Sequence, residues 1–276
     1  MAPRAYWKGY LRLSLVSVPV QLHSALDPDH DLRLHQIHKP SGGRVRHEKI
    51  VPGLGPVEPE DIVLGYEHEP GRHVLLEREE LSAVAPQPSD TIELAQFIAP
   101  EELDDIYVDR PFFVVPADKV GDEAYRVLRT ALKRTRRIGI GEMVLHRRER
   151  IVAVRPCGRG LMLETLRYAE ELRTAERYFG EIADTEPDPA KVRLAVELIE
   201  RESAPFEPRR FKDDHEAELR ALIQAKLRGR RRPEPRAAPP APAEVIDLMQ
   251  ALRRSLDALA AQTANRNVPA ERARSG

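Results

Sequence analysis

Alternating apolar and polar residues dominate the first two thirds of the chain and predict many short β-strands. In residues 7–25 the apolar positions are odd-numbered up to Leu15 and even-numbered from Val16, a one-residue shift that suggests a bulge. Further strand patterns, separated by Pro and Gly turns, lie at residues 73–76, 91–98, 107–115, 138–144 and 151–154. Many short strands of this kind favour a barrel or a sandwich.

A second strand pair is expected between residues 33 and 52, joined through Ser41, Gly42 and Gly43. Residues 33–49 carry five Lys or Arg against one acid, Glu48. The pattern therefore predicts a basic hairpin arm.

Helical spacing replaces the alternation at three further places. After the plausible N-cap Asp122, the residues Tyr125, Leu128 and Leu132 lie on one face and basic residues lie on the other. Asp188-Pro189 predicts the start of a second helix, and a third runs from near Asp213 to Gly229. The last two carry apolar stripes with no matching segment nearby, so we expect them to pack on the barrel or on a second subunit.

The Pro-rich composition of residues 230–243 predicts an extended linker that cannot fold on itself. An amphipathic helix is expected after it, with the apolar stripe Val245, Leu248, Met249, Leu252, Leu256 and Leu259. A helix of this length is marginal alone in water, so the stripe needs a groove on this protein or on another. The tether favours a groove on a partner.

Charge is strongly segregated although the whole chain has a net charge of only −1. Residues 126–155 hold ten Lys or Arg against two acids, whereas residues 58–105 hold fourteen acids against two Arg. Basic residues on neighbouring rigid elements suit a regularly charged partner, and nucleic-acid phosphate is the commonest one. The alternative is a solvated helix face followed by an ordinary polar turn.

The residue inventory excludes several kinds of site. Cys157 is the single cysteine, which rules out an internal disulfide and fits a reducing cytoplasm. His35, His38 and His47 invite a metal site, but no cysteine or carboxylate nearby completes a recognisable ligand set. We find no P-loop, no nucleophile elbow and no paired-metal carboxylate motif. No signal peptide or membrane-length apolar run is present, so we expect a soluble, cytoplasmic protein.

Seven blocks of sequence, taken in order, resemble bacterial Ku, the homodimeric DNA-end-binding protein of non-homologous end joining. The blocks are WKGYLRLSLVSVPVQLHSA, DIVLGYEHEPGRHVLL, IYVDRPFFVVPAD, AYRVLRTAL, LMLETLRYAEELR, FEPRRFKDDHEAELRALIQAK and VIDLMQALRRSLDA. Each block alone is modest, but seven in series across almost the whole chain are specific. The chain departs from the family at Leu13-Ser14, where Phe-Gly is usual, and at Leu64, where Lys is usual.

The resemblance implies an α+β fold with a Ku-type β-barrel core, a basic hairpin bridge and a C-terminal helical arm. The implied domains are the core at 1–185 with the bridge at about 30–52, a dimerisation arm at 186–229, the linker at 230–243, a ligase-recruiting helix at 244–260 and a disordered tail at 261–276. Two copies are expected to close a ring around double-stranded DNA that enters at an end. The expected further partner is the ATP-dependent ligase of the pathway, ligase D, and we expect no membrane partner and location at the nucleoid.

The residues expected to contact DNA are basic ones on the N-terminal strand, the hairpin arm and the segment after the first helix. They are Lys8, Arg12, Arg44, Arg46, Lys49, Arg137, Arg147, Arg148 and Arg150. Contacts to phosphate carry no sequence information, so binding should not depend on DNA sequence. The ligase would take the stripe Val245, Leu248, Met249, Leu252 and Leu256, and we expect no catalytic residue, metal or cofactor.

Two alternatives remain open from the sequence. One is a metal-dependent nuclease that uses His35, His38 and nearby acids. The other is a protein-only scaffold whose basic regions bind an acidic partner.

Overall fold

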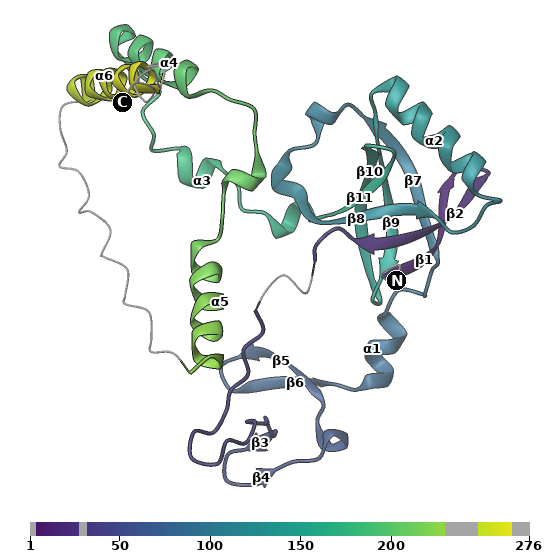
Figure 1. Ribbon diagram of the computed structural model, residues 1–276. Coiled ribbons are helices and arrows are strands. Elements are labelled where there is room, and N and C mark those ends of the chain that lie inside the picture. Colours follow the sequence, from purple (N-terminus) through teal and green to yellow (C-terminus); the bar gives the residue numbers. More distant parts are fainter. Residues whose placement is uncertain (1–3, 28–31, 230–247, 267–276) are drawn as a thin grey trace. The chain divides into compact units, whose positions relative to one another are not determined.

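The computed structural model describes residues 4–27, 32–229 and 248–266 (Figure 1). The chain divides into two compact units, Met1–Ala175 and Glu176–Gly276. The first unit holds the β-structure and the second is helical.

Seven strands of the first unit form a closed barrel, which confirms the predicted barrel core (Figure 1). Their order around the barrel is β1 (Trp7–Leu13), β2 (Val16–Ser24), β8 (Val108–Pro116), β11 (Gly160–Leu166), β10 (Arg148–Cys157), β9 (Ile138–Leu145) and β7 (Thr91–Ile98). Paired strands run antiparallel except β1 and β7, which are parallel and close the barrel.

The alternation of apolar residues fills the inside of this barrel. Its core includes fully buried side chains from five strands: Leu11, Val20, Ile92, Phe112, Val152 and Val154. Helix α2 (Asp122–Thr135) adds its apolar face, with Tyr125, Leu128 and Leu132 buried in the same core. Burial of each such side chain contributes roughly 1.5–3 kcal/mol relative to exposure, so α2 is an integral part of the barrel's packing.

In residues 7–25 the apolar residues change from odd-numbered to even-numbered positions at a turn. The predicted bulge is therefore wrong. Leu13 pairs with Val16, and the register from Trp7 to Leu13 is unbroken. Ser14 and Leu15 therefore form a two-residue hairpin loop, in which Ser14 has a φ of 53° and Leu15 is 98% exposed. A tight turn reverses the chain and exchanges inward and outward positions, just as a bulge would.

Residues 32–84 lie outside the barrel sheet and form short pieces of structure. These are β3 (Ile50–Val51), β4 (Gly55–Pro56), η1 (Pro59–Asp61), β5 (Leu64–Glu69), β6 (Arg72–Leu76) and α1 (Arg78–Val84). The predicted strand pair at 33–52 is reduced to one bridge between Ile37 and Arg44, beside a turn in which His38 and Gly43 bond through their backbones. Since almost every residue from 33 to 51 is exposed, no packed face holds longer strands in place.

The remaining elements are helical. Four 3₁₀ turns connect or follow larger elements: η2 (Pro100–Glu102), η3 (Asp105–Tyr107), η4 (Ala169–Glu171) and η5 (Pro208–Arg210). The second unit contains α3 (Glu176–Phe179), α4 (Pro189–Glu202), α5 (Asp214–Leu227) and α6 (Leu248–Arg266). As predicted, Asp188 and Asp213 cap α4 and α5, since their side chains accept backbone N–H bonds from Ala190 and Glu216. No helix among the described residues has the length and apolarity to cross a membrane.

Candidate nucleic-acid interface and barrel-mouth pocket

Lys8 and Arg12 lie on the outer face of β1, between inward-facing residues of the core. Lys8 is exposed, whereas the guanidinium of Arg12 forms an ion pair with Glu93 on the neighbouring strand β7. The hydrogen bond to Glu93, and then its charge, raise the pKa of Arg12. Arg12 is therefore largely compensated by a carboxylate of the acidic segment at residues 58–105.

A residue of the same acidic segment also forms an ion pair with a second arginine that was predicted to contact DNA. Arg137, which follows α2, lies 3.6 Å from the carboxylate of Glu102. Arg147, in the turn between β9 and β10, is exposed with a φ of 62°, and its Nη2 lies 3.5 Å from the hydroxyl of Ser82. Arg147 has no carboxylate within ion-pair distance in the described residues, so it keeps its charge for solvent or a ligand.

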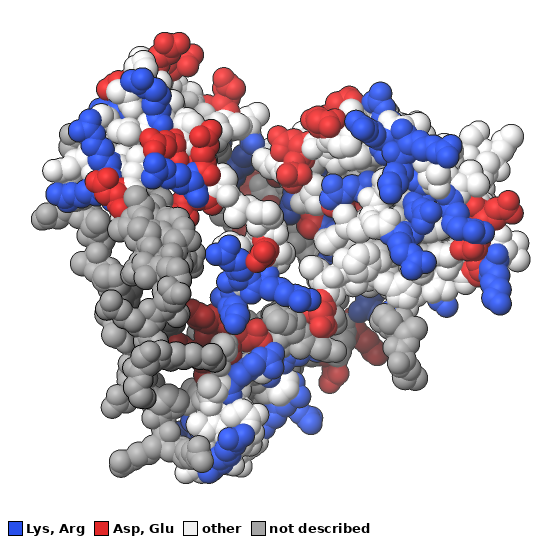
Figure 2. Space-filling view, turned by 45° about the horizontal axis from the view of Figure 1, so that its top comes forward, with Lys and Arg blue, Asp and Glu red and all other residues white. Residues whose placement is uncertain are grey.

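The predicted contacts of the basic arm, Arg44, Arg46 and Lys49, are all exposed. None forms an ion pair within the described part of the chain. Figure 2 shows blue lysine and arginine side chains spread over the part that holds the barrel, with red acidic ones mostly at its edges. The predicted basic residues thus come from several elements, which are β1, the arm, the segment after α2 and the β9–β10 hairpin.

Arg148 and Arg150 have a different surrounding, because the register of β10 turns them into the barrel. They alternate in phase with Val152 and Val154, which are fully buried. On β9 they pair with Leu145 and Met143, which also contact the core. The two arginines therefore lie at the end of the barrel where β8 and β10 begin and β9 and β11 end, here called the barrel mouth.

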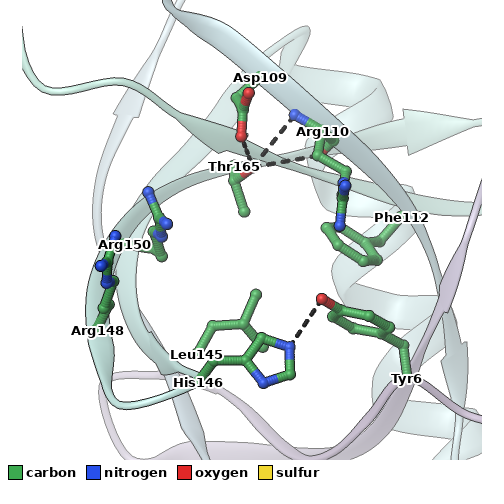
Figure 3. A pocket seen from close by; sticks show the side chains of 9 residues that line it. All are labelled: Tyr6, Asp109, Arg110, Phe112, Leu145, His146, Arg148, Arg150 and Thr165. Atoms are coloured by element: carbon green, nitrogen blue, oxygen red, sulfur yellow. Dashed lines mark hydrogen bonds between the residues drawn. The ribbon is translucent and has the colours of Figure 1, made fainter. Parts of the chain in front are cut away.

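A pocket of about 360 Å³ opens at the barrel mouth (Figure 3). It is lined by Tyr6, Asp109, Arg110, Phe112, Leu145, His146, Arg148, Arg150 and Thr165. The opposite end of the barrel carries α2, where the hydroxyl of Tyr125 donates to the carbonyl of Val114 at 2.6 Å and accepts from the N–H of Leu161 at 2.7 Å. Burial raises the pKa of this Tyr125 hydroxyl.

Two hydrogen-bonded groups fix the walls of this mouth pocket. The Tyr6 hydroxyl lies 2.8 Å from Nε2 of His146, and the Tyr6 ring packs at 5.0 Å from Phe112. On the other wall, the hydroxyl of Thr165 accepts from the backbone N–H of Arg110 and lies 3.3 Å from the carboxylate of Asp109. The pocket is therefore held open by side chains that already have partners.

The mouth pocket is cationic. Asp109 is its only acid, and that carboxylate pairs with Arg167 outside the lining at 3.1 Å. None of Arg110, Arg148 and Arg150 forms an ion pair in the described residues, so three positive charges face one hollow. Arg110, Tyr6 and His146 were absent from the predicted site. Arg110 alternates in phase with Phe112 and Val114, the signal that would have placed it inside.

The apolar stripe expected to bind a ligase is partly occupied within the protein. Helix α6 packs on α4, where Leu256 is 7% exposed and Met249 and Leu252 are half-buried. Leu248 is exposed, and Val245 lies outside the described residues together with the side chain of Leu259. Docking of this stripe on a ligase remains a prediction.

No group of three His, Cys, Asp or Glu side chains in the described residues could hold a metal ion. Nδ1 of His38 lies 2.7 Å from the hydroxyl of Ser41, in the turn of the arm. The nuclease alternative therefore gains no ligand cluster from this part of the chain.

Comparison with known families decides the affiliation. The family model of the Ku70/Ku80 beta-barrel domain matches residues 12–194. The chain belongs to the Ku family. Its Ku-type barrel and α+β class, expected from the sequence, are thereby confirmed.

Several relatives named "Non-homologous end joining protein Ku" match nearly the whole chain. The relative from Acidobacterium capsulatum is 42% identical over 92% of this chain and 84% of its own length. Those from Methylocella silvestris and a Bradyrhizobium species are 40% and 37% identical, over 93% and 99% of this chain and 96% and 94% of their own lengths. A solved SPOC domain of human PHD-finger protein 3 matches at 12% identity with a TM-score of 0.29, too distant to inform the fold.

Proposed function

We propose that the protein binds the ends of double-stranded DNA without sequence preference, as a ring-shaped homodimer, and acts in non-homologous end joining. The observation that carries the proposal is the similarity to end-joining Ku proteins over more than nine tenths of the chain. In this role the protein protects DNA ends and recruits the ATP-dependent ligase of the pathway.

The exposed basic residues supply the phosphate contacts in this proposal. Arg44, Arg46 and Lys49 on the arm, Lys8 on β1 and Arg147 at the hairpin turn all face solvent. Phosphate contacts position a duplex and do not read its bases, which accounts for binding without sequence preference. A closed ring cannot pass sideways onto an intact duplex, so entry at an end would give the preference for breaks.

Homodimerisation is supported by apolar residues of α4 that the protomer leaves exposed. Val192, Val196 and Ile199 lie at helical spacing on α4 and are 41%, 46% and 66% exposed. Phe206 and Phe211, which follow α4, pack on each other and are still more than 70% exposed. A second copy that buries this surface would remove the cost of exposing it to water.

The test compares linear duplex DNA with the same sequence as a closed circle. We expect a mobility shift of the linear form only, and equal binding to both topologies would contradict the ring. The exchange Arg44→Gln/Arg46→Gln should weaken binding and reduce the slope of log affinity against log salt by about 2. The control Arg72→Gln/Arg78→Gln removes the same charge from the acidic segment and should change neither quantity.

Two further measurements address the alternatives. Incubation of linear and nicked DNA with Mg²⁺, Mn²⁺ or Zn²⁺ should give no cleavage, and cleavage that depends on His35 and His38 would support the nuclease. Removal of residues 244–276 should spare end binding and abolish stimulation of the ligase. Unchanged stimulation would refute recruitment through α6.

A further inference from the structure

The mouth pocket concentrates positive charge on a fixed frame. Arg148 and Arg150 come from β10 and Arg110 from β8, and both strands are held in the barrel by pairing on two sides. Figure 3 shows the guanidinium groups on two sides of one hollow. Like charges held around a cavity repel one another, and a bound anion removes that repulsion. The pocket is therefore built for an anion.

The arginine fork fits carboxylate and phosphate alike, and the number of forks distinguishes the two anions. The planar fork matches phosphate oxygens in a bidentate manner, and three such forks offer more donors than one carboxylate could accept. The single acid of the pocket, Asp109, is engaged by Arg167 and Thr165 and does not neutralise Arg110. A phosphate ester is thus the ligand chemistry that the charges fit.

The shape of the pocket excludes a duplex and fits a small ligand. Its volume of about 360 Å³ lies at the lower end of ligand pockets in proteins, which measure roughly 300–1,000 Å³. It is half open to solvent and is bordered by the ends of strands and by residues on both sides of the β9–β10 turn. One phosphorylated group can enter such a hollow, whereas the body of a double helix cannot.

An aromatic wall stands beside the arginines. Tyr6 is 38% exposed, and its ring lies edge to face with His146 at 5.3 Å between centroids and packs at a tilt against Phe112. An exposed ring that is fixed by its neighbours and by a hydrogen bond is the kind of platform on which nucleobases stack. Phosphate-binding forks beside such a platform point to a nucleotide.

We propose that the mouth pocket binds a single nucleotide, with its phosphate held by Arg110, Arg148 and Arg150 and its base against Tyr6 and His146. The same chemistry has two sources, a free nucleotide and the terminal nucleotide of an unpaired strand at a DNA end. The second source rests on the proposed function, and the first does not.

The first experiment titrates the full chain with 5′-dAMP at low salt by calorimetry. Deoxyadenosine and inorganic phosphate serve as the two halves of the ligand. We expect saturable binding of 5′-dAMP, roughly tenfold or more tighter than either half, because both walls contribute. The absence of saturable 5′-dAMP binding would overturn the proposal.

Variants locate the binding. The exchange Arg148→Gln/Arg150→Gln should weaken 5′-dAMP at least about tenfold, because two charge-assisted contacts are lost. Arg126→Gln/Lys133→Gln on α2 removes the same charge outside the pocket and is the matched control. If the thermal unfolding midpoint of the Arg148→Gln/Arg150→Gln variant falls, the single exchange Arg110→Gln is used in its place, because Arg110 is exposed. The exchange Tyr6→Leu should lower the affinity for 5′-dAMP to the affinity for inorganic phosphate. The affinity for inorganic phosphate should stay unchanged. Unchanged 5′-dAMP affinity in both arginine variants would overturn the proposal.

A second experiment separates the two sources by comparing a blunt duplex with one that carries a short single-stranded overhang. Tighter binding of the overhang that is lost in the Arg148→Gln/Arg150→Gln variant, or on addition of 5′-dAMP, assigns the pocket to the DNA end. Equal binding of both duplexes, with 5′-dAMP still bound, assigns it to the free nucleotide. Binding of 5′-dAMP without binding of either duplex would refute the proposed function and leave the pocket assigned.

Discussion

We expect Tyr125 to contribute strongly to stability, because its hydroxyl group connects α2 to two strands of the barrel. It donates to the carbonyl of Val114 on β8 and accepts from the N–H of Leu161 on β11. The side chain is 4% exposed. The exchange Tyr125→Phe keeps the ring in the core and removes only the oxygen.

The loss leaves two buried backbone groups without their partner. Each unsatisfied buried group costs about 1–3 kcal/mol, so we expect the free energy of unfolding to fall by about 2–6 kcal/mol. For a unit of this size, 1 kcal/mol corresponds to roughly 2–4 °C in the midpoint. The unfolding midpoint of the barrel should therefore fall by about 4–24 °C.

The assay is thermal and urea unfolding of the full chain, followed by circular dichroism. The matched control is Tyr10→Phe, on the outer face of β1, where the ring is 44% exposed. This control should change the free energy of unfolding by less than about 0.5 kcal/mol. A Tyr125→Phe protein as stable as the control would refute the view that α2 is bonded into the barrel.

The same hydroxyl predicts a pH dependence. Burial raises the pKa of Tyr125 in the folded protein above its ordinary value of 10.0. Above pH 10 the unfolded chain then releases a proton that the folded protein retains, so stability falls as pH rises through the folded pKa. Below pH 10 this contribution is fully present. In the Tyr125→Phe variant the free energy of unfolding should no longer fall with pH above 10. An unchanged fall would show that another group causes it.

Three further predictions follow from other contacts. A Cβ on Gly141 would lie 2.0 Å from the carbonyl oxygen of Glu93, so Gly141→Ala should destabilise the barrel by about 1–3 kcal/mol in urea unfolding, whereas Gly43→Ala in the exposed arm should not. Arg155→Gln removes the partner of Glu164, which is 4% exposed, and should lower the unfolding midpoint more than the exposed exchange Arg201→Gln. Leu256→Asp should release α6 from α4 and increase its cleavage by trypsin, with Leu248→Asp as the exposed control.

The barrel could be predicted because its inner positions obey one simple period. Six of the seven barrel strands lie on an expected alternating pattern. The seventh, β11, was not expected, because Leu161, Met162 and Leu163 follow one another without alternation. The position of α2 followed from Tyr125, Leu128 and Leu132 at helical spacing. A turn and a bulge both shift the alternation by one residue, and the pattern alone does not distinguish them. The turn at Ser14-Leu15 was therefore taken for a bulge.

In the basic arm, by contrast, the sequence pattern predicted more strand structure than the protein contains. Residues 33–52 have the composition of a hairpin, yet only one bridge joins Ile37 to Arg44. Turn residues specify a reversal of the chain, whereas strands persist only when a face is buried. Val45 and Ile50 are 42% and 65% exposed, so the protomer provides no such face.

The sequence named basic residues as candidates but did not predict how they are arranged, because charge was counted along the chain without regard to the side of each strand. Arg147, Arg148 and Arg150 are neighbours in sequence, but only the last two share a phase with Val152 and Val154. That phase separates them from Arg147 and joins them to Arg110 of β8, which is 38 residues away from Arg148 in sequence and lines the same pocket. An arginine in phase with a barrel's buried residues has to lie at a mouth, because a guanidinium in the middle of the core would lack both water and a partner. The same argument extends to closed barrels whose interior is filled by apolar side chains. Charged residues that continue an inward apolar period identify the end that is open to solvent, and the sign of their charge identifies the ligand that this end can accept.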